Sequence, residues 1–65
     1  MTVLYTTGCP RCKVLHRKLQ EKGVSFTVID DINIMLDKGF MEAPVLEVDG
    51  KEMSFAEAVS WVNNL

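Results

Sequence analysis

The sequence predicts a small α/β domain in which a four-stranded mixed sheet is flanked by helices, in the order strand, helix, strand, helix, strand, strand, helix. Three observations carry this prediction. Apolar patterns typical of strands and of helices alternate through the first half of the chain. Asp49-Gly50 joins two short strand patterns in the second half. A helical pattern introduced by Ser54-Phe55-Ala56-Glu57 then follows.

Length and composition limit the number of domains and the classes of partner that the chain can have. The 65 residues, 48% of them hydrophobic, suit one compact domain spanning 1–65. The net charge is −2 and no basic cluster occurs, which argues against nucleic-acid binding. No apolar run approaches the roughly 18 residues of a membrane span, and Met1-Thr2-Val3 lacks the charged start of a signal peptide. We therefore expect no membrane association, a cytoplasmic location and a monomer.

The first strand is predicted at Thr2-Val3-Leu4-Tyr5-Thr6. Leu4 points away from Val3 and Tyr5, so both faces of this strand carry apolar side chains. That pattern is typical of a central strand covered on each side.

A helix is predicted from Pro10 to Lys22. Val14, Leu15 and Leu19 recur at helical spacing and define its expected buried face. Gly23 supplies the stop, because glycine readily adopts the left-handed conformation found after helix ends.

The next two elements are a strand and a short helix. The segment from Val24 to Ile29 is rich in β-branched and aromatic residues, and strand, helix, strand at this spacing predicts a right-handed parallel crossover. Asp30 or Asp31 can cap a short helix that ends at Gly39. Its expected shared face consists of Ile32, Met35 and Leu36.

The second half of the sheet is predicted to be antiparallel. Pro44 opens a strand over 45–48, and Asp49-Gly50 turns the chain into a second strand over 51–53, because both turn residues tolerate positive φ. Ser54 and Glu57 form a capping box. The last helix then presents one apolar face, made of Phe55, Ala58, Val59 and Val62.

The motif Cys9-Pro10-Arg11-Cys12 joins the first strand to the first helix. With Cys9 as N-cap and Pro10 as first helical residue, the Cys9 sulfur faces unpaired N–H groups and the positive end of the helix dipole, which favour the thiolate. Arg11 adds a positive charge that is expected to lower the Cys9 pKa further. Cys12 lies one turn on, roughly 5 Å away between Cα atoms, within disulfide range.

A redox role explains this pair better than a structural one. A disulfide that closes a four-residue loop stabilises a fold only a little, because the entropic gain from a disulfide grows with the length of the loop it closes. Disulfide exchange needs an accessible attacking thiolate and a nearby resolving thiol, roles that suit Cys9 and Cys12 respectively. A metal site of Cys9, Cys12 and His16 is the competing hypothesis. The chain has no further Cys or His to complete four zinc ligands.

With Cys9-Pro10-Arg11-Cys12 after the first strand, Ala43-Pro44 before the third and Asp49-Gly50 in the last hairpin, the whole chain resembles the glutaredoxin branch of the thioredoxin-fold family. The resemblance implies a dithiol-disulfide oxidoreductase with catalytic Cys9 and Cys12. It implies a cis Pro44 packed against the cysteines and an Ala43 backbone that pairs with a substrate strand. Pro10 and Arg11 complete the implied substrate-binding residues.

The resemblance also implies a disulfide-containing protein as substrate, no tightly bound cofactor and glutathione as a reductant. Residues that usually hold glutathione in glutaredoxins are replaced here by Glu42-Ala43 and Met53-Ser54. A hydrogen donor reduced by thioredoxin reductase is therefore an open alternative. A metal or iron–sulfur carrier that uses the same cysteines is a further one.

Overall fold

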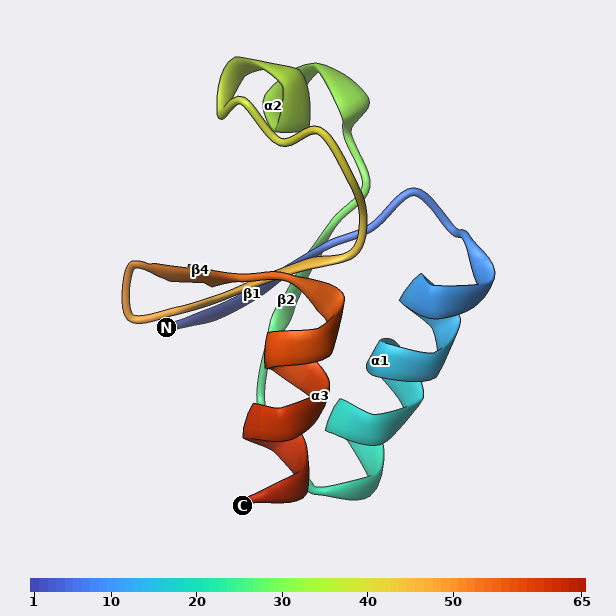
Figure 1. The fold of residues 1–65 in the computed structure, drawn as a ribbon, viewed down its shortest axis with the longest axis vertical. Coiled ribbons are helices and arrows are strands. Elements are labelled where there is room, and N and C mark those ends of the chain that lie inside the picture. Colours follow the sequence, from blue (N-terminus) through green and yellow to red (C-terminus); the bar gives the residue numbers. More distant parts are fainter.

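The fold of residues 1–65, seen in a computed structural model, has the predicted order of elements (Figure 1). The boundaries of its strands and helices are β1 Thr2–Tyr5, α1 Pro10–Glu21, β2 Thr27–Ile29, α2 Ile32–Asp37, β3 Val45–Val48, β4 Lys51–Met53 and α3 Phe55–Asn63. None of the three helices combines the length and the apolar character that crossing a membrane requires.

The four strands form one mixed sheet in the order β2-β1-β3-β4. β1 pairs parallel to β2 and antiparallel to β3, and β3 pairs antiparallel to β4. The prediction that the first strand is central is confirmed, since β1 has a neighbour on each side. β2 and β4 are the two edges.

The two faces of the sheet carry different layers. Leu4 belongs to a core cluster with buried residues of α1 and α3, which lie side by side (Figure 1). Val3 and Tyr5 belong to a second cluster with Val45 and Met35, and Met35 comes from α2. Figure 1 shows α2 apart from the other helices, beyond the end of the sheet that β3 enters. The small α/β architecture is therefore covered unequally on its two faces.

The second strand is shorter than predicted. Its register with β1 begins at the pair Val3 and Thr27, and β1 extends only one residue further back, to Thr2, so at most the last of residues 24–26 has a β1 residue opposite it. The N–H of Val24 instead donates to the carbonyl of Leu19 at 3.1 Å and completes the end of α1. The ring of Phe26 packs against the core cluster. These residues connect α1 to the sheet.

The predicted apolar faces of two helices were only partly right. Leu15 and Leu19 are fully buried, whereas Val14 is 46% exposed, because it lies beside the stripe that faces the sheet. In α2 only Met35 is buried, and Ile32 and Leu36 remain exposed. A six-residue helix at the end of a sheet has too little core beneath it to cover a whole face.

The predicted helix end at Gly23, the hairpin turn and the capping box are confirmed. Gly23 has φ of +70° and its N–H donates to the carbonyl of Gln20 at 3.1 Å, as in a glycine-terminated helix end. Asp49 and Gly50 have φ of 50° and 88°, as the hairpin turn requires. The capping box of α3 has both of its hydrogen bonds, between Ser54 and Glu57.

Candidate functional site

The two cysteines lie together at the start of α1. Cys9 is the N-cap with extended backbone, and Pro10 is the first helical residue, where its missing N–H costs nothing. The backbone N–H of Cys12 donates to the Cys9 sulfur at 3.3 Å. The two Sγ atoms are 2.8 Å apart, a hydrogen-bonded contact between free thiols. The predicted capping geometry therefore holds at the motif itself.

The two thiols differ in access to solvent. Cys9 is half-buried, since it lies outside the first turn of the helix. Cys12 is only 1% exposed, since it lies on the face of α1 that turns toward the core. The pair thus has one reachable sulfur and one sheltered sulfur, as expected from the sequence.

The thiol whose pKa is lowered is Cys12. Burial acts to raise its pKa, but hydrogen bonds from the Cys9 thiol, the Thr6 side chain and the Thr7 backbone outweigh that effect and lower the pKa from 9.0 to about 7. The sequence-based prediction concerned the thiolate of Cys9, which is linked to Cys12 by the 2.8 Å contact through which one sulfur can donate its proton to the other.

Ala43 lies beside Cys9, although 34 positions separate the two residues along the chain. The Sγ of Cys9 lies 3.9 Å from the carbonyl oxygen of Ala43. The Ala43–Pro44 peptide bond is cis and Pro44 is buried. The loop between α2 and β3 thus forms one wall of the site, as the resemblance implied.

Arg11 contacts the first residue of the last helix. Its side chain is exposed, and its guanidinium carbon is 5.9 Å from the ring centroid of Phe55, the first residue of α3. Arg11 and Phe55 line a hollow of about 180 Å³ together with Glu42, Ala43 and Ser54. Sequence reasoning missed Phe55 as a site residue, because it was assigned to the core face of the last helix.

An apolar groove adjoins the exposed sulfur. Cys9 lines this hollow of about 280 Å³, and its apolar walls come from α2 and the loop that follows it: Ile32, Met35, Leu36, Phe40 and Met41. Glu42 and Ala43 line it too, so the groove and the Arg11 hollow meet at these two residues. The sequence contained one signal for this groove, the apolar face predicted for the short helix.

The hypothetical metal site with His16 is not assembled. The ring of His16 lies edge-on to the ring of Phe26, with centroids 5.3 Å apart, and is half-buried there. No group of three His, Cys, Asp or Glu side chains in the chain is placed to hold a metal ion. His16 packs against Phe26 instead.

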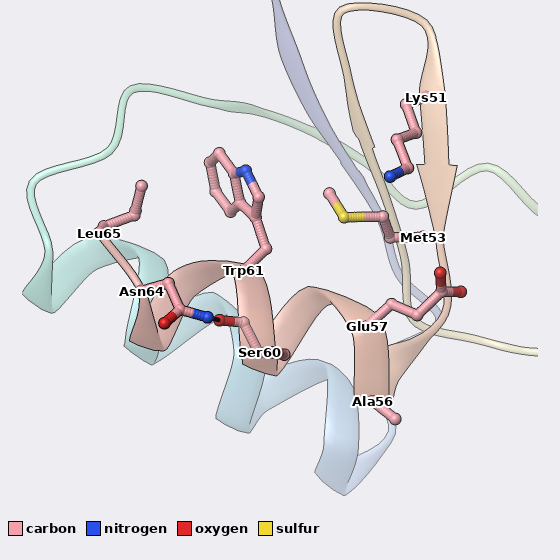
Figure 2. Close-up of a pocket in the computed structure, with 8 residues that line it drawn as sticks. All are labelled: Lys51, Met53, Ala56, Glu57, Ser60, Trp61, Asn64 and Leu65. Atoms are coloured by element: carbon pink, nitrogen blue, oxygen red, sulfur yellow. Dashed lines mark hydrogen bonds between the residues drawn. The ribbon is translucent and has the colours of Figure 1, made fainter.

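The largest hollow of the molecule lies away from the cysteines. It has a volume of about 610 Å³ and lies between α3 and the edge strand β4 (Figure 2). Trp61 and Met53 point into the same space there, and the side-chain amide of Asn64 donates to the carbonyl of Ser60 at 2.8 Å. Its lining includes no cysteine or histidine. Of the two cysteines, Cys9 lines the smaller apolar groove.

No protein-family model matches the chain, and no curated protein is significantly similar to it in sequence. The geometry of the cysteine pair is therefore the basis for proposing a function. This site brings together two thiols, a backbone carbonyl and an apolar groove.

Proposed function

We propose that this chain is a dithiol-disulfide oxidoreductase of the glutaredoxin type, with Cys9 and Cys12 as its catalytic residues. The observation that carries the proposal is the 2.8 Å separation of a reachable and a sheltered sulfur at the start of a helix. Two thiols so placed can form a disulfide with little movement of the backbone. A purely structural pair would gain little from so short a loop.

The arrangement of the elements supports a thioredoxin-like fold. The cysteine motif follows the central strand β1, and Pro44 precedes β3, the antiparallel neighbour of β1. The carboxyl end of β1 and the start of β3 lie at the same end of the sheet, which explains why the two motifs meet. In this proposal the backbone of Ala43 pairs with an extended substrate segment, and Pro10 and Arg11 border the same surface.

The reaction begins with the Cys9 thiolate, which attacks one sulfur of the substrate disulfide. A bond forms between Cys9 Sγ and that sulfur, the substrate S–S bond breaks, and the second substrate sulfur leaves as a thiolate that takes up a proton. The lowered pKa of Cys12 favours loss of the first proton from the pair near pH 7. Proton transfer across the 2.8 Å contact then allows the negative charge to reside on Cys9.

Cys12 completes the exchange. The Cys12 thiol loses its proton to solvent, and the resulting thiolate attacks Cys9 Sγ. The Cys9–Cys12 disulfide forms, the bond between Cys9 and the substrate sulfur breaks, and that sulfur leaves as a thiolate that takes up a proton. Two electrons pass from the dithiol to the substrate, which gains two thiols while the protein gains one disulfide. A thiol or dithiol reductant must then restore the pair. We propose that glutathione or thioredoxin reductase fills this role, in the cytoplasm, on a monomeric protein without a tightly bound cofactor.

The roles of the two cysteines are tested by trapping. A Cys12→Ser variant lacks the resolving thiol, so mixing it with a disulfide substrate is expected to leave a mixed disulfide on Cys9, visible as the added mass. The matched Cys9→Ser variant is expected to form no adduct and to show no turnover. Full turnover by Cys9→Ser would contradict the proposal.

The reductant is identified on the oxidised wild-type protein. Reduced glutathione is added in one reaction, and thioredoxin reductase with NADPH in another, while loss of the Cys9–Cys12 disulfide is followed by mass. Fast reduction by glutathione would assign a glutaredoxin-type cycle. Reduction by the reductase alone would assign a thioredoxin-type cycle on the same scaffold.

A further inference from the structure

The apolar groove opens directly beside the sulfur that is proposed to attack the substrate. Cys9 is part of its lining, and its volume of about 280 Å³ is near the lower limit of roughly 300 Å³ for small-ligand pockets. A hollow of this size suits one or two side chains. A substrate sulfur bonded to Cys9 would therefore have its neighbouring residues at the groove.

The walls of the groove expose unusually large apolar side chains. Met41 is 98% exposed, Leu36 is 64% exposed and Ile32 is 58% exposed. Single exposed apolar residues are common, but three around one hollow form a contiguous patch of the kind that contacts a partner. Met41 adds a flexible side chain that can adapt to different shapes.

The packing of α2 against the sheet keeps Ile32 and Leu36 of this patch exposed. Ile32 and Leu36 are one turn apart and share a face of the helix. Met35 is buried in the cluster with Val3 and Tyr5 and anchors the helix to the sheet. Rotation of α2 to cover Ile32 and Leu36 would expose Met35. The apolar face of the groove is thus a stable surface of the protein.

The segment that forms the groove is acidic. Residues 30–42 contain Asp30, Asp31, Asp37 and Glu42 against a single basic residue, Lys38. Lys38 is engaged with the sheet, since its Nζ lies 3.9 Å from Glu47 Oε1 and 5.6 Å from the centroid of the Tyr5 ring. No cation of this segment is left to neutralise the carboxylates.

Glu42 is the one carboxylate among the residues that line the groove with Cys9, and it precedes Ala43. It takes part in none of the chain's three ion pairs. Arg11 lines the adjoining hollow with Glu42, yet its guanidinium lies over the ring of Phe55. Glu42 is therefore available to a positive charge on a substrate.

We infer that the preferred substrate of the Cys9–Cys12 pair is a polypeptide disulfide flanked by one apolar and one basic side chain, the apolar one in the groove and the basic one near Glu42. This inference rests on the proposed oxidoreductase function. A disulfide of glutathione, which brings carboxylates and no large apolar side chain, fits the same surface poorly. The groove thus assigns the substrate class through apolar burial and charge complementarity.

Four synthetic peptides of equal length test this inference. Each carries a single cysteine as a mixed disulfide with thiopyridine, flanked by Leu and Lys, Leu and Glu, Ser and Lys, or Ser and Glu. The rate of thiopyridine release by the reduced wild-type protein is measured for each. Bis(hydroxyethyl) disulfide serves as an uncharged reference, and oxidised glutathione as the anionic competitor.

The Leu and Lys peptide is expected to react fastest. Burial of the Leu side chain predicts an advantage of about tenfold over the Ser and Lys peptide. An exposed charge contact predicts an advantage of up to about fivefold over the Leu and Glu peptide, decreasing as salt is added. The two effects are separable because each peptide pair changes one side chain.

Variants of the protein assign each preference to its residue. Leu36→Ala is expected to reduce the ratio of rates between the Leu and Ser peptides. Glu42→Gln is expected to abolish the ratio between the Lys and Glu peptides. Val14→Ala removes an exposed apolar side chain of α1 that does not line the groove, and both ratios are expected to persist in it.

The outcomes separate the inference from the function on which it rests. No reaction with any peptide or with bis(hydroxyethyl) disulfide would overturn the proposed oxidoreductase. Equal rates with all four peptides, or faster reaction with oxidised glutathione than with the Leu and Lys peptide, would overturn the substrate inference and leave the oxidoreductase standing.

Discussion

At the scale of single residues, Cys9 and Cys12 acquire different properties although they are three positions apart. Cys9 lies outside the helix as its cap, whereas Cys12 lies in its first turn and faces the core. The hydrogen bonds gathered by Cys12 exceed the effect of its burial, so its pKa falls to about 7. The half-buried Cys9 remains the sulfur that a reagent can reach.

This difference predicts a pH-dependent reactivity of the reduced protein. The pKa of an acid is lowered here, so the thiolate forms as the pH rises, at about 7 instead of 9.0. Because the two sulfurs are 2.8 Å apart, charge formed at Cys12 can appear at Cys9 through proton transfer. The rate at which iodoacetamide alkylates the reduced cysteine pair is therefore expected to rise through a midpoint near pH 7 and then level off.

The control for this titration is Cys12→Ser, which removes the partner sulfur. Its midpoint is expected to lie higher than that of the wild type, because a neutral hydroxyl cannot take part in the same ionisation. A wild-type midpoint near 9, or identical midpoints in both proteins, would contradict the role assigned to Cys12.

At the scale of secondary structure, the stability of the short helices depends on how their ends are capped. α3 has nine residues, and its first turn is closed by the reciprocal bonds between Ser54 and Glu57. α1 ends at Glu21, and Gly23, which follows its C-cap Lys22, has a φ of +70° that other residues adopt at a cost. A large share of the hydrogen bonds in such helices is terminal, so each cap contributes noticeably to stability.

Ser54→Ala is expected to lower the free energy of unfolding by about 1 kcal/mol, because the cap loses the acceptor for the Glu57 N–H. Urea denaturation of the reduced protein measures the change. Ser60→Ala is the matched control, an exposed serine inside the same helix, and is expected to change stability by a few tenths of a kcal/mol at most. Equal losses in both variants would contradict the capping argument.

Gly23→Ala is expected to lower the free energy of unfolding by about 1 kcal/mol as well. The space around this position is open, so the loss would come from the positive φ alone and not from a clash. Ser25→Ala, in the exposed connection two residues later, provides the control. A thermal unfolding curve with no change at Gly23→Ala would show that the end of α1 relaxes freely.

At the scale of the whole molecule, stability depends on one well-filled layer. Leu4, Leu15, Leu19 and Leu46 are fully buried between the sheet and the helices α1 and α3. The opposite face has a smaller cluster around Tyr5 and Met35, since α2 covers only part of it. The unequal layers leave α2 free to present its other face beside Cys9.

Leu46→Ala is expected to cost about 2–5 kcal/mol, because Leu46 is fully buried in the central layer and its loss leaves a cavity. A chain of this length has a total stability of roughly 3–10 kcal/mol, so a large fraction of the variant would be unfolded. Urea denaturation followed by circular dichroism measures both the loss of stability and the unfolded fraction. Val28→Ala, at an exposed position of the edge strand β2, is expected to cost far less, and a similar loss there would contradict this account of the core.

Features set by neighbouring residues could be predicted from the sequence. The order of the elements, the hairpin turn at Asp49-Gly50, the capping box at Ser54 and the N-cap position of Cys9 were all predicted correctly, because each depends on local backbone preferences. The proximity of Cys9 and Cys12 belongs to the same class, since one helical turn separates them.

Other features depend on which elements lie against each other. The strand predicted at 24–29 is observed only at Thr27–Ile29, because β1 extends just one residue before the first pair, Val3 and Thr27. Val14 stayed exposed because the sheet beneath α1 reaches only the neighbouring stripe. Periodicity identifies apolar residues, but it does not say how much core each face meets.

The sequence by itself determined a single α/β domain with a cysteine pair at the start of a helix, because chain-local geometry suffices for both. Only the tertiary structure decided what surrounds that pair. The approach of Ala43 to Cys9, the position of Arg11 over Phe55 and the groove formed by α2 join residues that are far apart in the chain. Such contacts are set by the pairing of β1 with β3 and by the packing of the helices, which no local pattern encodes.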